Sequence, residues 1–214
     1  MANVPGAIMK LALILPLALA AFIGAARAEE VDDIHEATTA EADTFNARIY
    51  AGPPGKTAYA CFVRRYDAAH LAQHPKQKVA SMKLLVSAET YEVDNQLRNS
   101  FRIGFHYRHR SGAFDSGGSC HHAVFTKDGS EVRLNCGVDC EGGGVGIALS
   151  KDDKSAIVRL ESIRIWPHNN PTEDKDRSLV AGQDDGIFRL DRTDNSECAA
   201  LVTDRKELAA LRHK

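Results

Sequence analysis

The chain has 214 residues, of which 43% are hydrophobic, and a formal net charge of −2. This length is sufficient for one domain of ordinary size with its own hydrophobic core. The near balance of charges gives no electrostatic footprint for nucleic acid or for an anionic membrane surface, so the composition argues against a nucleic-acid-binding protein.

An export signal is predicted at the N-terminus. Lys10 is followed by the apolar run LALILPLALAAFIGA at 11–25, and ARA at 26–28 supplies the small residues that precede a cleavage site. The run is short for a membrane span, although an uncleaved anchor is the alternative. We expect residues 1–28 to be a signal peptide, the mature chain to begin at Glu29, and the protein to be periplasmic or secreted without a transmembrane segment.

The segment after the leader is acidic. Seven carboxylates and one arginine precede Ile49, and the segment ends in Pro-Pro-Gly. Such a composition predicts that residues 29–56 are a solvated arm or a marginal helix, followed by a linker. We therefore expect the folded part to begin near Thr57 and to occupy residues 57–214 as a single β-rich domain.

From this point the hydrophobic pattern has the period of two that strands show. In residues 101–109 apolar side chains alternate with arginine and histidine, and residues 131–138 repeat the pattern. Alternation of this kind indicates one buried and one solvated face, and hence antiparallel pairing. The other strand candidates are 58–65, 79–87, 119–126, 143–149, 155–166 and 186–191.

Eight strands separated by Gly, Asp and Asn predict an all-β barrel or sandwich. Because most connections are short, we favour an up-and-down meander that forms a small barrel with a lipocalin-like outline. A short helix is expected near 67–74, since Pro75 must end it. A C-terminal helix is expected within 203–214, where Asp204 and Glu207 form a capping pair.

The cysteines of an exported protein are expected to form disulfides. After the leader the chain has five of them, Cys61, Cys120, Cys136, Cys140 and Cys198. The sequence KDG at 127–129 is typical of a three-residue hairpin loop, which places Cys120 opposite Cys136 at about the separation that a disulfide needs. A two-residue turn at Asp128 and Gly129 would shift this register by one.

A second bridge is predicted between Cys61 and Cys198, which lie near the two ends of the folded part. Cys136 and Cys140 would be about 13 Å apart along an extended strand, so they need different partners unless residues 137–139 turn sharply. Cys140 is then a free thiol that is buried, paired with another chain or reactive, and we favour burial.

One motif suggests a hydrolase. The sequence DSGG at 115–118 resembles the nucleophile loop of trypsin-like serine proteases, and DAAH at 67–70 resembles the stretch that carries their base. The resemblance implies Ser116 as nucleophile and His70 as base, and Asp94 would complete a convergent triad.

The flanking residues argue against this interpretation. In that family Gly precedes the motif and Pro follows it, whereas Phe114 and Ser119 stand in those places here. His70 and Ser116 are 46 residues apart, too few for the two-barrel fold of that family. We therefore predict a glycine-rich loop that leads into the strand at Cys120, with Ser116 outside in the loop and no catalytic role.

The spacing of the histidines does not predict a metal site. His70 and His74 are one helical turn apart, and His121 and His122 follow Cys120 directly. Zinc or copper would need a third and a fourth ligand, and neighbouring residues of a strand point to opposite faces. We therefore predict structural histidines and no metal.

Two glycine-containing stretches resemble cofactor loops only loosely. Residues 140–150 lack the helix that a phosphate-binding loop requires, and residues 181–188 lack the ligand spacing of a calcium loop. Each is followed by a strand pattern, the second after a turn at Asp185 and Gly186. We predict turns at both places and no cofactor.

A basic row on one strand is the remaining surface feature. It is usually the solvated face of a strand, but it is also suited to an acidic partner. Its members are Arg102, His106, Arg108 and Arg110. We expect a non-catalytic binding or envelope-associated protein that takes a small lipophilic ligand or an acidic protein partner. The alternatives are a serine hydrolase and a periplasmic metal-binding protein.

Three stretches together resemble an uncharacterised group of exported, β-rich proteobacterial proteins with no assigned activity. They are YDAAHLAQHPKQ at 66–77, RLNCGVDCEGGG at 133–144 and DDGIFRLDR at 184–192. The likeness spans most of 57–198 and implies a sixth cysteine after the strand at 155–166. Here RIWPHNN at 164–170 has His168 and no thiol, in agreement with an unpaired Cys140.

Overall fold

A computed structural model of the chain describes residues 33–127, 129–139, 142–170, 178–180, 182 and 184–212. The predicted signal peptide at 1–28 and the predicted free thiol Cys140 lie outside the described residues. Among the helices that the structure describes, none has the length and apolar character needed to cross a bilayer.

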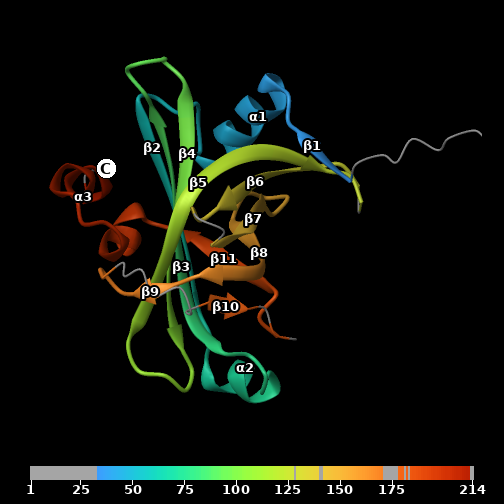
Figure 1. Cartoon of the computed structure of the whole chain (residues 1–214), viewed down its shortest axis with the longest axis vertical. Helices are drawn as coiled ribbons and strands as arrows, with labels where there is room; N and C mark the ends of the chain where they lie inside the picture. Colours follow the sequence, from blue (N-terminus) through green and yellow to red (C-terminus); the bar gives the residue numbers. More distant parts are fainter. Residues whose placement is uncertain are drawn as a thin grey trace, which may run out of the picture. The chain divides into compact units, whose positions relative to one another are not determined.

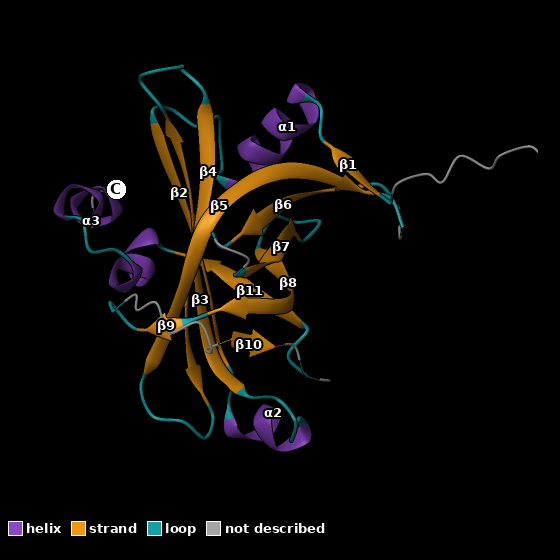
Figure 2. Ribbon diagram, viewed as in Figure 1, coloured by secondary structure: helices purple, strands orange, loops and turns teal. Residues whose placement is uncertain are grey.

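Eight antiparallel strands form a closed barrel (Figures 1 and 2). They are β2 (Thr57–Arg65), β3 (Val79–Thr90), β4 (Leu97–Tyr107), β5 (Ala113–Phe125), β6 (Glu131–Gly137), β7 (Gly143–Leu149), β8 (Ser155–Arg164) and β11 (Ile187–Thr193). Each pairs with the next in this series, and β11 closes the barrel on β2. The predicted up-and-down β-barrel is thereby confirmed.

Shorter elements surround the barrel. Strands β1 (Ile34–Glu36) and β9 (Trp166–Pro167) pair with β5, and β10 (Ser178–Val180) pairs with β8. The helices are α1 (Thr39–Ile49), α2 (Ala68–Gln73), the 3₁₀ helix η1 (Asn195–Leu201) and α3 (Arg205–Arg212). The short helix and the C-terminal helix therefore lie where the sequence predicts them.

The interior of the barrel is filled by apolar side chains. On β4, Phe101, Ile103 and Phe105 are buried, whereas Arg102 is half-buried and His106 is exposed, as the alternation predicts. The neighbouring strands add further fully buried side chains, among them Phe62, Leu84, Leu134, Ile147 and Phe188. These residues form one hydrophobic core.

The two predicted disulfides are both present. Cys120 lies directly opposite Cys136 in the β5–β6 hairpin, and the Cα atoms of the pair are 4.0 Å apart. Gly129 supplies the positive φ of +99° that the hairpin loop requires. The predicted register of this hairpin is therefore confirmed.

The second bridge fixes η1 to the outside of the barrel. Cys61 on β2 is bonded to Cys198 on η1, which are 137 residues apart in the sequence. Both cysteines belong to a small outer cluster of apolar residues that also contains Leu85, Val202 and Leu211. The C-terminal segment is thus packed on the β2–β3 wall.

Folded structure begins well before Thr57, so that expectation is wrong. Thr38 and Glu41 form a capping box in which each side chain accepts the backbone N–H of the other, and α1 starts there. Phe45 and Ile49 are 2% and 0% exposed and belong to the barrel core. Of the two possibilities for this segment, the helix is present, and it packs against the barrel.

The stretch around Ser116 is not a loop, which corrects a second expectation. Strand β5 already begins at Ala113, and Ser116 is 1% exposed. The glycines serve close packing of the backbone, because a Cβ at Gly118 would lie 1.9 Å from the carbonyl oxygen of Gly137.

Candidate ligand-binding site at helix α1

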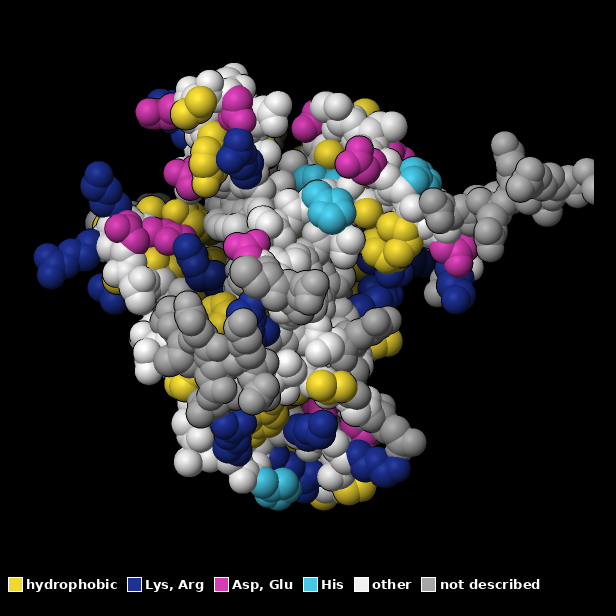
Figure 3. Space-filling model, viewed as in Figure 1, with side chains coloured by type: hydrophobic (Ala, Val, Ile, Leu, Met, Phe, Trp, Pro, Cys, Tyr) yellow, Lys and Arg dark blue, Asp and Glu magenta, His cyan; other side chains and the backbone are white. Residues whose placement is uncertain are grey.

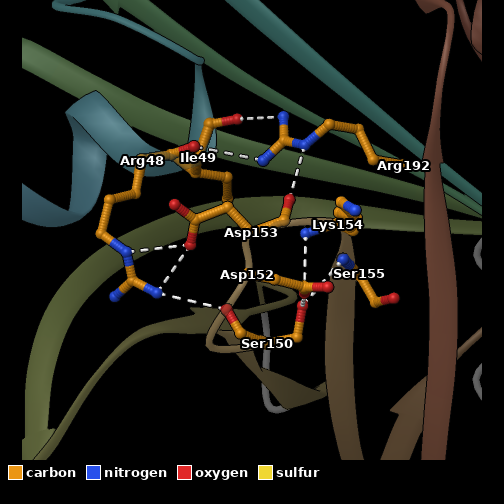
Figure 4. Close-up of polar contacts among 8 residues, drawn as sticks. All are labelled: Arg48, Ile49, Ser150, Asp152, Asp153, Lys154, Ser155 and Arg192. Carbon is orange, nitrogen blue, oxygen red and sulfur yellow. Dashed lines mark hydrogen bonds and ion pairs between the residues drawn. The ribbon is translucent and has the colours of Figure 1, made fainter.

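The C-terminal end of α1 is held by two arginines (Figure 4). Arg48 donates from Nε and Nη2 to Asp153 Oδ1 at 2.9 and 2.7 Å, and Arg192 of β11 donates to the carbonyl oxygens of Ile49 and Arg48 at 2.7 and 3.1 Å. Carbonyl groups at a helix end have no partner within the helix, so Arg192 supplies one.

The β7–β8 loop that receives Arg48 is itself ordered by local hydrogen bonds. Asp152 Oδ1 accepts from the hydroxyl of Ser150 at 2.7 Å and from the backbone N–H of Lys154 at 3.2 Å. These contacts order the loop, and the hydrogen bonds from Arg48 to Asp153 and Ser150 hold it beside the helix (Figure 4). The position of α1 is therefore fixed by both side-chain and backbone contacts.

The side of α1 that faces the barrel meets buried polar groups. Asn46 Oδ1 is 3.0 Å from His122 Nε2, and the ring of Phe45 contacts that of His122 edge-on, with 5.7 Å between centroids. The hydroxyl of Tyr50, just after the helix, donates to Asn99 Oδ1 at 2.7 Å. Burial raises the pKa of Tyr50, which therefore stays protonated.

The half-buried His122 makes the stability of the barrel dependent on pH. Burial lowers the pKa of His122, with a smaller contribution from His121. As the pH falls below about 6.5, the unfolded chain takes up a proton at this side chain before the folded chain does. We expect the free energy of unfolding to fall there and to be fully retained above that pH.

Chemical denaturation at a series of pH values measures this effect. The variant His122→Gln should show a flatter dependence on pH below 6.5, because it removes the group. The matched variant His109→Gln alters an exposed histidine and should follow the wild type. An unchanged slope in His122→Gln would contradict the assignment.

A cleft of about 720 Å³ lies between α1 and the adjoining ends of β6, β7 and β8. This volume is within the range of small-molecule sites. Phe45, Val132 and Leu149 form its apolar wall. The polar and charged side chains that line it are Glu41, Thr44, Arg48, Ser130, Glu131, Arg133, Lys151 and Arg159. The cleft can therefore contact both an apolar and a charged part of a ligand.

The charges of the cleft do not cancel. Arg48 is paired with Asp153, and Arg133 is paired with Glu131 at 2.5 Å. Arg159 is 3.7 Å from the same carboxylate, which it must share with Arg133. Lys151 and Glu41 also line the cleft, so two cations, Arg159 and Lys151, stand against one remaining carboxylate and the excess charge is positive.

Arg159 carries the most unusual atom of the site. Its Nη1 is buried and has no hydrogen-bond partner, the one such side-chain atom in the part of the chain that the structure describes. A buried donor without an acceptor costs free energy, so a group of this kind calls for an explanation. Nη1 is closed to a water-sized atom as it stands, so an acceptor oxygen of a ligand in the cleft would supply the partner once the guanidinium group turns toward the opening.

The structure does not bring the hydrolase candidates together. The hydroxyl of Ser116 donates to the carbonyl oxygen of Arg164 at 2.6 Å. His70 lies on α2 and contacts Gln77, and Asp94 lies in the β3–β4 turn, where it is paired with Arg98. The three candidates therefore lie on three different elements, and each contacts a residue outside the proposed triad.

An Asp–His pair does occur on the outer wall of the barrel. Asp115 accepts from His168 Nδ1 and from the backbone N–H of Asn169, each at 2.9 Å. Ser116 follows Asp115 directly on β5 and therefore points to the opposite face, into the core. The pair thus has no access to this hydroxyl, and it fastens the segment after β9 to β5.

The four histidines considered as metal ligands, His70, His74, His121 and His122, have contacts within the protein. The rings of His70 and His74 are stacked at 4.3 Å, and His121 and His122 point to opposite faces of β5. No group of three or more His, Cys, Asp or Glu that could hold a metal ion is found among the described residues.

The basic row of β4 is divided among several contacts. Arg102 is paired with Glu207 of α3 at 2.6 Å, and Arg108 donates to the carbonyl oxygens of Leu71 and His74 on α2. Arg110 lies over the ring of Phe114, and His106 is exposed. Glu207 of the same chain thus already forms the ion pair that an acidic partner would make with Arg102.

No family model, curated protein or solved structure matches the chain. The fold and the cleft therefore define its class, which is an eight-stranded antiparallel barrel with a packed core and a charged cleft beside a helix.

Sequence reasoning missed this site. A signal was present, because Arg159 interrupts the apolar pattern of the strand at 155–166, and Thr38 and Glu41 have capping-box spacing. What the sequence could not supply was the placement of α1 and Arg159 of β8 around one cleft, which depends on tertiary packing.

Proposed function

We propose that the protein is an exported, non-catalytic binding protein that takes a small amphiphilic anion in the cleft at α1. The observation that carries the proposal is the buried Nη1 of Arg159, which has no acceptor among the described residues. A carboxylate or sulfonate oxygen is the acceptor that a guanidinium group binds most strongly.

The lining of the cleft supports an amphiphilic ligand over a simple ion. Phe45, Val132 and Leu149 offer an apolar wall beside the cationic groups of Arg159 and Lys151. Small-molecule sites commonly combine such a wall with a few polar groups that fix orientation. Because side chains fill the barrel core, we place the ligand at the cleft instead of in the interior.

Three observations support export. The N-terminal sequence has the pattern of a signal peptide, and two disulfides are formed, as is usual outside the reducing cytosol. The resemblance to exported proteobacterial proteins favours the same compartment, either the periplasm or the outside of the cell.

Fluorescence titration with anilinonaphthalene sulfonate tests the proposal, since this probe combines a sulfonate with apolar rings. We expect a saturable signal that dodecanoate displaces. The variant Arg159→Met retains a long side chain but loses the guanidinium group, and its affinity should be about 10- to 100-fold lower.

Two further measurements separate binding from stability. The control Arg205→Met removes an exposed arginine from α3 and should bind as the wild type does. Arg159→Met should change the melting temperature little, because it removes a buried donor that has no partner together with a long ion pair of 3.7 Å to Glu131. Equal affinity in Arg159→Met and the wild type would exclude this cleft as the ligand site.

A further inference from the structure

The end of the barrel at α2 carries cationic side chains that the net charge of the whole chain conceals. Lys76, Lys78 and Arg110 are exposed and line a cleft of about 330 Å³ together with His109 and Tyr107. No carboxylate lines this cleft within the described part of the chain. Figure 3 shows several Lys and Arg side chains at this end, with hydrophobic side chains among them.

The backbone that presents these cations is firmly held. Asp185 is fully buried and accepts the N–H groups of Lys78 and Val79 at 2.8 and 3.2 Å. Gln77 is also buried and donates from Nε2 to the carbonyl oxygen of Val79 at 2.6 Å. The lysines on either side of Gln77 therefore project from an ordered segment.

The arginine of this surface has its own support. The guanidinium group of Arg110 lies 4.2 Å from the ring centre of Phe114. Arg108 ties the preceding residues to α2 through the carbonyl oxygens of Leu71 and His74, at 2.8 and 3.3 Å. The loop after β4 and the segment after α2 thus present a single cationic surface.

Exposed apolar side chains lie beside the cations. Val180 and Ile187 are 51% and 65% exposed, which is high for large aliphatic residues. Val180 adjoins Lys78, whose Nζ donates to its carbonyl oxygen at 3.5 Å, and Ile187 lines a neighbouring cleft with His70 and His74. Cationic and apolar groups therefore share one end of the barrel.

Three carboxylates that the structure describes at this end are engaged with the backbone. Asp184 accepts the N–H of Lys76 at 3.2 Å, and Asp67 caps α2 through the N–H of His70 at 2.7 Å. With the buried Asp185 they anchor the segments that carry the cations. None of the three lines the cationic cleft.

We propose that this end of the barrel docks on the surface of an anionic phospholipid membrane. Lys78 and Arg110 would contact lipid phosphates, while Val180 and Ile187 lie at the level of the headgroups. Peripheral binding of this type combines electrostatic attraction with a modest apolar contact. A soluble phosphate would use the cations but leave the two aliphatic side chains in water, so a membrane surface fits both features.

Cosedimentation with phospholipid vesicles tests this proposal and does not involve the α1 cleft. We expect binding to vesicles of phosphatidylcholine with phosphatidylglycerol, weaker binding as salt is added, and none to phosphatidylcholine alone. The double variant Lys78→Gln/Arg110→Gln should partition about 30-fold more weakly, since each cation near an anionic surface contributes about fivefold.

A matched control removes the same charge elsewhere. The double variant Arg205→Gln/Lys206→Gln alters exposed residues of α3 and should bind as the wild type does. Ile187→Ser should also weaken vesicle binding, which a purely ionic contact would not show. Three results would each overturn the proposal. They are equal vesicle binding by the two double variants, binding to neutral vesicles, and displacement from vesicles by inorganic phosphate at constant ionic strength.

Discussion

Replacement of Cys61 and Cys198 by alanine should lower the free energy of unfolding by about 5 kcal/mol. This bridge closes a loop with a sequence separation of 137 residues, and a cross-link restricts the unfolded chain more strongly when the loop is longer. A loss of this size is comparable to the whole stability of many domains. Denaturant unfolding under non-reducing conditions measures it.

The hairpin bridge provides the internal comparison. Cys120 and Cys136 are separated by only 16 residues, so Cys120→Ala/Cys136→Ala should cost about 3 kcal/mol. Both double variants remove a disulfide and two buried or half-buried sulfur atoms. A larger loss for the hairpin bridge would show that local packing, and not loop length, determines the contribution of the disulfides.

Phe45→Ala should lower the free energy of unfolding by about 3–5 kcal/mol, the usual cost of truncating a buried phenylalanine. Phe45 is 2% exposed and belongs to the barrel core although it comes from α1. The substitution also removes part of the apolar wall of the cleft, so binding of anilinonaphthalene sulfonate should weaken with it. Denaturation and the probe titration check the two effects separately.

A control at a half-buried position of the same helix tests the role of packing. Ala47→Gly should cost only about 1 kcal/mol, the difference in helix propensity between the two residues. If Phe45→Ala cost no more than Ala47→Gly, α1 would be an appendage to the barrel and not a part of its core.

The barrel strands were predictable because their information is local. The alternation of apolar and polar residues along β4 and β6 predicted both strands and their buried faces. The residue spacing around the β5–β6 hairpin predicted the pairing of Cys120 with Cys136. Short connections then favoured the meander. Each of these features depends on residues close together in the sequence.

The errors arose where tertiary contacts outweigh composition. The segment that contains α1 is acidic, yet two apolar residues one helical turn apart, Phe45 and Ile49, suffice to bury its inner face. Gly117 and Gly118 suggested a loop, whereas in the strand they allow a close approach of neighbouring backbones. Composition cannot distinguish these cases, because the deciding partners are distant in the sequence.

The candidate site shows the same limit. Arg159 is conspicuous in an apolar strand, but its missing partner became evident only when α1 and β6 were placed beside it. Asp185 was expected to form a turn, and its buried contacts with Lys78 and Val79 come from 106 or more residues away. Sequence patterns located these residues without revealing what surrounds them.

The crystal structure of the protein with dodecanoate is the most direct test of the proposed ligand site. We predict that a carboxylate oxygen lies within hydrogen-bond distance of Arg159 Nη1 and that the alkyl chain contacts Phe45 and Leu149. A carboxylate bound elsewhere, with Nη1 of Arg159 still lacking an acceptor, would contradict the proposal.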